Sequence, residues 1–400
     1  MRKHIKTFIV TALACSLLLG AGISAKAESK VAINDTNFSA EVKREAEEAD
    51  TNGDGYLSET EASKVKKLYF APNYNLDSFK GIEYFPDITY FYYRGRSAGE
   101  YEDFDIIEES TASEIDLSGF EKLERVRIDC RTPYLKTVNL EDCTKLKELT
   151  IEGSVLNTDG ITSLNLDGCT NLQTVYCRDI AISKLKLAGL KKLTEITVIG
   201  DNMETLNLKN CTKLKTVLAG GDRLMKLKLK GDKNLEELSV VSDSMENLDL
   251  STNTKLKELS LDNVKIDAPD LSHNKNLTKL DCYQTEIISL DLRENRNLTM
   301  VDCHNNKMLQ ELKVKGCNKI KTLRCYNTAL TKLNVKKNSS LTRLHCKQTQ
   351  ISKLNLKNNK KLKKLICTET NIQELDLSNT KIKDASGLEC DPAVSVTYAD

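Results

Sequence analysis

The chain has 400 residues, of which 40% are hydrophobic and only 18 are Gly and 5 are Pro. It is therefore long enough to bury a large core, and this composition excludes a disordered polypeptide. The formal net charge of +1 at pH 7 excludes a uniformly acidic or basic protein, but it does not exclude local segregation of charge.

The segment 1–27 has the pattern of a secretion signal. A basic head at residues 2–6 precedes an apolar run at residues 8–23, and a small-x-small cleavage site ends at Ala27. We expect a mature chain that starts near Glu28 and is secreted, either free or retained non-covalently on the cell surface. An uncleaved membrane anchor and lipid attachment at Cys15 are the alternatives.

The stretch DTNGDGYLSETE follows at residues 50–61 and has the ligand spacing of an EF-hand calcium loop. Gly55 at loop position 6 allows the sharp turn. The expected oxygen ligands of one structural Ca2+ are Asp50, Asn52, Asp54, the backbone carbonyl of Tyr56, Ser58 and Glu61. An acidic turn without a metal is the alternative.

Apolar residues on both sides of this loop predict two flanking helices. Phe38, Val42 and Ala46 share one face of the incoming helix, and Ala62, Val65 and Leu68 share one face of the outgoing helix. Residues 28–67 are therefore expected to form a helical, EF-hand-like cap. Dockerin modules have a similar loop, but in two copies that end in Asp. A single loop favours a bracing role over a calcium sensor.

A long internal repeat follows the cap. Ten units run from Asp167 to Leu377, all of the same length of about 21 residues except for one that is longer by a single residue, and weaker units extend back to Leu68. In SHNKNLTKLDCYQTEIISLDL, residues 272–292, the apolar positions form two short alternating runs, which predicts about two strands per coil and leaves no room for a helix. Residues 68–377 are thus expected to stack as a solenoid of parallel strands, with a closing cap at residues 378–400.

The pattern L-x-x-L-x-C/L, then T/N-x-I/L, then L-D-L-S-x-N resembles the short bacterial variant of leucine-rich repeat proteins, of which internalins are better-known relatives. The resemblance covers about three quarters of the chain. It implies a mainly β leucine-rich repeat solenoid, and it indicates function only loosely.

Ten of the 13 cysteines recur in two columns of the repeat. The strand column contains Cys177, Cys282, Cys303, Cys325, Cys346 and Cys367, where other units have apolar residues. The turn column contains Cys143, Cys169, Cys211 and Cys317, which alternate with Asn253, Asn274, Asn295, Asn338 and Asn359. We expect buried free thiols in the first column and hydrogen-bond donors in the second. Disulfides between stacked coils are the alternative, although side chains in parallel register seldom meet the required torsion.

Catalysis and zinc binding find little support in the sequence. Cys303 and His304, and likewise His345 and Cys346, are neighbours on a strand, so their side chains point to opposite faces and cannot share a metal. No nucleophile elbow, phosphate loop or zinc helix is present, and the acidic run at residues 99–110 has the pattern of a solvated loop. We therefore expect a protein that is not an enzyme.

The residues between the inward positions form outward columns that can bind a ligand. One contains Tyr176, Asp281, Asp302, Arg324 and His345, and the next contains Tyr283, His304, Tyr326 and Lys347. This pattern favours a non-catalytic, monomeric binding or adhesion protein, with a passive cell-envelope scaffold as the alternative. An aromatic band at residues 69–104 either stacks on sugars or fills the core beside the cap.

Charge is strongly segregated along the chain. Between Glu311 and Glu369 there are 16 basic residues and no acidic one, whereas residues 28–122 hold 22 acidic and 10 basic residues. The expected partner is accordingly a protein or an anionic polysaccharide, and nucleic acid is less favoured; a solvated basic face without a partner is the alternative. The candidate ligand-binding residues are Lys321, Arg324, Tyr326, Arg343, His345, Lys347 and Lys364.

Overall fold

A computed structural model describes the protein at residues 29–34, 36, 38–70, 76–95, 110–130, 132–153 and 160–398. The predicted secretion signal and most of the acidic run at residues 99–110 lie outside these ranges. The chain divides into two compact units, one that ends at Cys169 and one that begins at Thr170.

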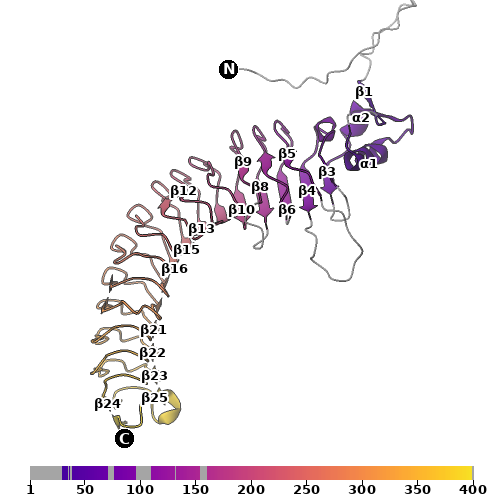
Figure 1. Ribbon diagram of the computed structural model, residues 1–400. Helices are drawn as coiled ribbons and strands as arrows, with labels where there is room; N and C mark the ends of the chain where they lie inside the picture. Colours follow the sequence, from indigo (N-terminus) through magenta and orange to yellow (C-terminus); the bar gives the residue numbers. More distant parts are fainter. Residues whose placement is uncertain are drawn as a thin grey trace, which may run out of the picture. The chain divides into compact units, whose positions relative to one another are not determined.

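The first unit begins with the predicted helix-loop-helix segment (Figure 1). Helix α1 (Ala40–Ala49) buries Val42 and Ala46, and helix α2 (Glu59–Ala62) follows the loop. Between them, strand β2 (Tyr56–Ser58) pairs antiparallel with β1 (Lys30–Ala32). The cap at residues 28–67 is thus partly β, because β1 supplies hydrogen-bond partners for the backbone groups of β2 in the loop.

The outgoing helix is shorter than predicted. It ends after one turn, so that Leu68 lies in strand β3 (Lys67–Phe70) rather than on a helical face shared with Ala62 and Val65. Leu68 and Phe70 are both buried and alternate with the exposed Lys67 and Tyr69. This period of two matches a strand, and the strand pairs in parallel with β4 (Tyr90–Gly95) of the next coil.

The rest of the first unit is a stack of parallel strands. The main sheet has the order β3, β4 (Tyr90–Gly95), β6 (Arg125–Cys130) and β8 (Glu148–Glu152). The second apolar runs form a separate sheet of β5 (Glu114–Asp116), β7 (Thr137–Asn139) and β9 (Ser163–Asn165). A short 3-10 helix, η1 (Ile82–Tyr84), connects β3 to β4.

The second unit repeats this arrangement in regular coils (Figure 1). Its main sheet pairs successive coils in parallel and in register, for example Thr174 with Glu195 and Glu195 with Thr216. The strands in order are β10 (Thr174–Arg178), β11 (Glu195–Ile199), β13 (Thr216–Gly220), β15 (Glu237–Val241), β16 (Glu258–Asp262), β17 (Lys279–Asp281), β19 (Met300–Asp302), β21 (Thr322–Arg324), β22 (Arg343–His345), β23 (Lys364–Ile366) and β25 (Leu388–Glu389). The mainly β solenoid predicted from the repeat is confirmed.

The second apolar run of each coil forms a strand less often than predicted. In the second unit the strands of this run pair as β12 (Thr205–Asn207) with β14 (Lys226–Lys228), β18 (Ser289–Asp291) with β20 (Glu311–Lys313), and β24 (Glu374–Asp376) with β26 (Ser395–Thr397). Leu333 and Leu356 lie between such strands and are buried without one. The apolar pattern reports burial, and burial does not require a complete hydrogen-bond ladder.

The strand column of cysteines lies inside the core, as predicted. Cys177, Cys282, Cys303, Cys325, Cys346 and Cys367 are all 0% exposed. The 12 cysteines of the described residues are free thiols, and only Cys390 is partly exposed. Burial raises the pKa of the Cys177 thiol to about 12, so these groups remain protonated and behave as small hydrophobic side chains.

The turn column also points inward, but it is polar. The Asn295 amide donates to the backbone carbonyls of Leu271 (2.9 Å) and Asn274 (3.0 Å) in the preceding coil. Asn253, Asn274, Asn338 and Asn359 make the same two bonds. The Cys317 thiol donates a single bond to the Leu292 carbonyl (2.9 Å), and Cys143, Cys169 and Cys211 do likewise with their own preceding coils. The predicted donor role of this column is confirmed.

Most of the described aromatic band fills the core of the first unit. Phe70, Phe79, Phe91 and Tyr93 are buried, with the Phe79 and Tyr93 rings 5.2 Å apart and edge-on. Tyr84 and Tyr90 are half-buried, and Tyr69 is 54% exposed and stacks on Tyr92 at 4.5 Å. Tyr74, Tyr101 and Phe104 lie outside the described residues. Core filling therefore accounts for the larger part of this band.

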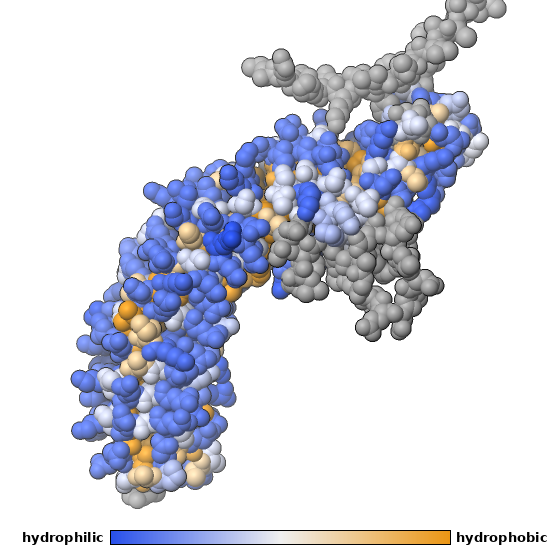
Figure 2. All heavy atoms as spheres, viewed as in Figure 1, coloured by the Kyte–Doolittle hydropathy of each residue, from blue (hydrophilic) through white to orange (hydrophobic). Residues whose placement is uncertain are grey.

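The end of the second unit continues the solenoid. β25 pairs with β23, and β26 pairs with β24, so the closing segment covers the last edge of both runs. Over the coils, hydrophilic residues dominate the face shown in Figure 2. In the described part of the chain, no helix is both long and apolar enough to cross a membrane.

Candidate binding face and calcium loop

The outward face of the main sheet in the second unit brings polar side chains into columns. Parallel register places Asp281 beside Asp302, Asp302 beside Arg324, and Arg324 beside His345. Strands in a sheet are about 4.8 Å apart, so neighbours in such a column are close enough to interact directly. These four residues belong to the predicted column. Its fifth predicted member, Tyr176, has the same register on β10, five coils before Asp281.

A ladder of aromatic rings joins three members of the second predicted column, Tyr283, His304 and Tyr326, to His345 of this column. Tyr283 stacks on His304 at 5.5 Å, His304 on Tyr326 at 4.5 Å, and Tyr326 on His345 at 4.2 Å, with interplanar angles between 6° and 22°. Each ring comes from a different coil, so the stacked coils hold the ladder rigidly. We call these four residues the ring ladder.

Asp302 is the centre of the charged network. It is 3% exposed, its Oδ1 lies 2.6 Å from His304 Nδ1, and its Oδ2 accepts a hydrogen bond from Arg324 at 3.1 Å. Two partners therefore compensate this buried carboxylate. The same contacts fix His304 and Arg324 on the outward face.

The neighbouring carboxylates are compensated less well, since Asp262 has only a long hydrogen bond of 3.4 Å from the Ser260 hydroxyl to its Oδ2. Asp262 and Asp281 are half-buried, and no described group hydrogen-bonds to the Oδ1 atom of either. Burial, and then the charge of Asp281, raises the pKa of Asp262 to about 6. Burial and the charge of Asp302 also raise the pKa of Asp281. The sequence analysis missed Asp262, although its position one repeat length before Tyr283 is the signal that places it beside the ring ladder.

His345 is also incompletely satisfied. Its Nε2 atom is buried without a hydrogen-bond partner among the described residues. Burial and the nearby Arg324 guanidinium lower its pKa, which favours the neutral ring. The ring is therefore held neutral within the face, with one buried nitrogen left without a partner.

The basic residues predicted to bind a ligand are partly neutralised. Lys347 pairs with Glu369 at 3.0 Å, and Lys364 pairs with Glu389 at 3.0 Å. Lys321, Arg324 and Arg343 are exposed, while Tyr326, His345 and Lys347 are half-buried. All seven predicted residues belong to β21, β22 or β23 or lie close to an end of these strands. The structure brings them to one region, but their charges are mixed with carboxylates.

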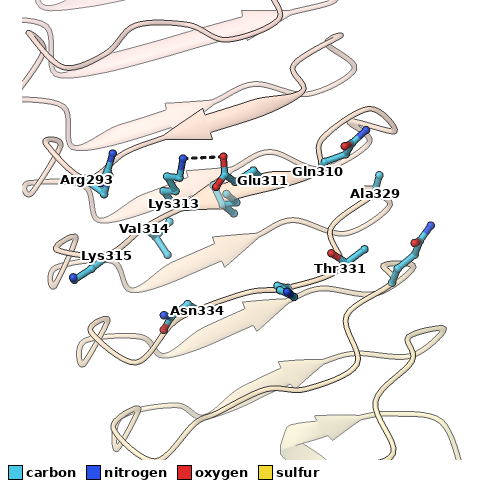
Figure 3. A pocket seen from close by; sticks show the side chains of 12 residues that line it. Arg293, Gln310, Glu311, Lys313, Val314, Lys315, Ala329, Thr331 and Asn334 are labelled. Carbon is cyan, nitrogen blue, oxygen red and sulfur yellow. Dashed lines mark ion pairs between the residues drawn. The ribbon is translucent and has the colours of Figure 1, made fainter.

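The remaining lysines of the basic run lie elsewhere on the coils. Lys332 lines a depression of about 880 Å³ on the side of the second apolar run, together with Arg293, Lys313 and Lys315 (Figure 3). Figure 3 shows Lys313 and Glu311 facing one another, and they form an ion pair of 2.8 Å. The 16 basic residues of the run therefore do not share one surface.

The predicted calcium loop forms a tight turn around the side chain of its first residue, Asp50. The Asp50 carboxylate accepts hydrogen bonds from the N–H groups of Gly53 (2.8 Å) and Gly55 (2.9 Å). Gly55 has φ of 79°, a left-handed conformation that glycine adopts without strain. The chain thus wraps around its first carboxylate as the predicted turn requires.

The last predicted ligand, Glu61, is held by hydrogen bonds. Its Oε1 accepts from the Thr51 backbone at 3.0 Å, and its Oε2 accepts from the Ser58 hydroxyl at 2.7 Å, within a capping box at the start of α2. These bonds, those from Ser58 first, lower the pKa of Glu61 to about 2. Glu61 is therefore ionised at any physiological pH.

The donor set of the loop fits a hard cation. Asp50, Asn52, Asp54, Ser58 and Glu61 all supply oxygen atoms, and they lie within the single short loop 50–61. However, Asp54 pairs with Lys30 at 2.6 Å, and within the described ranges no three His, Cys, Asp or Glu side chains converge as metal ligands do. Calcium binding would require the Glu61 carboxylate to break its hydrogen bond with Ser58. It would also require Lys30 to release the Asp54 carboxylate.

Comparison with known proteins identifies the fold. No protein-family model matches the chain, and no curated protein does. The functional domain of InlJ from Listeria monocytogenes, whose description includes a cysteine ladder, is similar over 88% of this chain and 78% of its own length, with a TM-score of 0.53 and 22% identity. The fold is that of leucine-rich repeat proteins.

A second solved structure of the same fold comes from an animal protein complex. It is a chain from the Toll–Spatzle complex of Drosophila in its glycosylated form, with a TM-score of 0.53 and 15% identity. The match covers 84% of this chain and 54% of that one. At these identities the two likenesses show the fold alone.

Proposed function

We propose that this protein is a non-catalytic binding scaffold whose outward sheet face, over residues 258–347, docks another protein. The observation that carries the proposal is the pair of half-buried carboxylates, Asp262 and Asp281, neither of which forms an ion pair within the described part of the chain. Like charges in a half-buried site cost free energy in the free protein. A cationic side chain of a partner would offset that cost, so the partner is expected to place Lys or Arg there.

The rest of the face supports a protein rather than a uniform polymer. Carboxylates gather on β16, β17 and β19, and basic side chains gather on β21, β22 and β23. The ring ladder runs along both groups of strands and offers aromatic surface of the kind that is enriched in protein interfaces. The Drosophila complex named above provides an example of a leucine-rich repeat chain in complex with another protein.

An anionic polysaccharide is the second candidate partner. It is favoured by the 16 basic residues between Glu311 and Glu369. Against it stand the ion pairs of Lys347 and Lys364, which reduce the free positive charge of the face. In either case the signal-like segment supports a secreted or surface location, and adhesion is the expected role.

Site-specific photo-crosslinking tests the proposed face. A photoreactive residue at Tyr283 should form adducts with a protein from surface extracts of the source cells. A photoreactive residue at the exposed Lys353, which lies in the second apolar run of its coil, should form none. The double change Asp262→Asn and Asp281→Asn should abolish the adduct. Equal adducts from both positions, or adducts that survive the double change, would overturn the docking proposal.

A charge-reversal variant separates the second candidate. Changing Lys321, Arg324, Arg343, Lys347 and Lys364 to Glu should lower the salt concentration of elution from heparin if an anionic polymer binds these coils. Elution at the same salt would exclude that partner. No adduct from either position and no heparin retention together would favour the passive scaffold.

We also propose that the loop at residues 50–61 binds one Ca2+ that braces the cap. The bound ion would be held by Asp50, Asn52, Asp54, Ser58, Glu61 and the Tyr56 carbonyl, and as in extracellular modules its dissociation constant should be about 0.1–1 mM. Calorimetry of the mature chain should show one site that is lost in Glu61→Gln. The Glu59→Gln variant, which changes an exposed neighbour, serves as the matched control.

A further inference from the structure

One member of the turn column is an aspartate. Asp232 makes the same backbone turn as its neighbours: its N–H donates to Leu229 (3.1 Å) and its carbonyl accepts from Leu235 (3.2 Å). Asn253, one coil later, makes the equivalent bonds at 3.0 and 3.1 Å. The side chain of Asp232 therefore occupies the position from which the asparagines reach the preceding coil.

The surroundings of Asp232 do not suit a carboxylate. The residue is 0% exposed, and neither Oδ1 nor Oδ2 has a hydrogen-bond partner in the described structure. In Asn253 the amide nitrogen donates two bonds, and only Oδ1 lacks a partner. A neutral carboxylic acid can make one of these two bonds, since its single O–H can donate and its other oxygen takes the place of Oδ1, whereas a carboxylate has nothing to donate.

We propose that the folded protein holds Asp232 in its protonated form, with the O–H donating to the backbone carbonyl of Leu208 or Cys211 in the preceding coil. This pH-sensitive hydrogen bond holds the two coils together, and we call it the latch. These two carbonyls correspond by register to the Leu229 and Asp232 carbonyls that accept from Asn253. The latch is closed in mildly acidic solution and weakens toward alkaline pH. Nothing in this proposal depends on the binding function proposed above.

The groups around Asp232 agree with this protonation state. Burial raises the pKa of Asp232 to about 7, and the backbone N–H of Cys211 and then the Lys191 ammonium lower it only in part. The Cys211 N–H already donates to the Leu208 carbonyl at 3.2 Å, so it is not a full hydrogen-bond partner of the carboxyl group. The Cys211 thiol in the preceding coil has its own pKa raised by burial to about 11, so it carries no charge that could help. Asn253 packs from the following coil and is neutral.

The sign of the pH effect follows from the two pKa values. In the unfolded chain this carboxyl ionises near pH 4, as an ordinary aspartate does. Between about pH 4 and the folded pKa of about 7, the folded state binds the extra proton, so the free energy of unfolding falls as pH rises. In this window the unfolding equilibrium constant should rise by up to about tenfold per pH unit, and above it the effect is constant.

Two matched variants test the latch in the full mature chain. Thermal unfolding and backbone hydrogen exchange of residues 208–232, corrected for intrinsic rates, are measured from pH 4.5 to 8.5. In Asp232→Asn the protection from hydrogen exchange should no longer fall above pH 5, and the midpoint temperature of unfolding at pH 8 should be higher than in the wild type. Asn274→Asp should create a second site with the same pH dependence. Equal pH slopes in wild type and Asp232→Asn, or a variant less stable than wild type at pH 8, would overturn the proposal.

A direct measurement covers the case in which a variant does not fold. The carboxyl carbon of Asp232 in the wild-type protein should titrate near neutral pH in a 13C spectrum of Asp-labelled material. A resonance already in the ionised position at pH 5 would show that the latch does not exist.

Discussion

In the strand column, Cys303 and Cys325 occupy a position where other coils have Val198 or Leu261, whereas in the turn column Cys317 stands between Asn295 and Asn338. The same residue type thus replaces a hydrocarbon in one place and an amide in the other. The difference lies in the backbone nearby. At the turn, carbonyls of the preceding coil face the side chain, while in the strand the ladder already uses them. A cysteine tolerates both settings because its thiol is small, apolar and a weak donor.

The most damaging exchange between the two columns should be Cys325→Asn. It buries an amide where no carbonyl is free, so the free energy of unfolding should fall by about 2–4 kcal/mol in urea titration. Cys325→Val, which keeps an apolar side chain of similar size, should cost less than about 1.5 kcal/mol. Equal losses in the two variants would show that the strand column is not selective for apolar groups.

Removing the donor from the turn column should have the next largest effect. Asn295→Leu deletes the bonds to Leu271 and Asn274, and the expected loss is about 1–3 kcal/mol because both carbonyls keep only their backbone partner. Asn318→Leu changes an exposed side chain in the next turn and should stay within about 0.5 kcal/mol. If the two variants unfold at the same urea concentration, the turn column contributes no hydrogen-bond energy.

The reverse exchange, Cys317→Asn, should have almost no effect on stability. The amide can make two bonds where the thiol makes one, so the free energy of unfolding should change by less than about 1 kcal/mol, and toward greater stability. Thermal and urea unfolding measure this change. A clear loss of stability would mean that the turn at Cys317, which follows the one longer unit of the repeat, differs in shape from the others.

Alkylation of the native protein compares the thiols without any change in sequence. Burial raises the pKa of Cys177 and Cys325 to about 12 and of Cys317 to about 11, so none of them should react with iodoacetamide at pH 8 within hours. Cys390, the partly exposed thiol of the described part, should react first. Mass spectrometry that finds strand-column thiols labelled at the same rate, or oxidised to disulfides, would contradict this order.

Much of the binding face could be predicted from the repeat alone. A period of two places Asp281, Asp302, Arg324 and His345 outward, and the constant repeat length stacks them, so their column follows from counting. Counting could not show that Asp302 is compensated by His304 and Arg324 while Asp281 is not, because side-chain rotamers and burial decide that contrast.

The sequence by itself determined the coil length, the inward positions, the donor role of the turn column and the spacing of the calcium-type loop, since each follows from a local period or motif. Only the tertiary structure decided where the outgoing helix ends, which second runs become strands, which basic residues are neutralised by Glu369 and Glu389, and which carboxylates are left without partners. The physical reason is that these outcomes depend on neighbours from other coils. Hydrogen-bond partners, burial and charge compensation come from residues one repeat length away in the sequence, and they exist only once the coils have stacked.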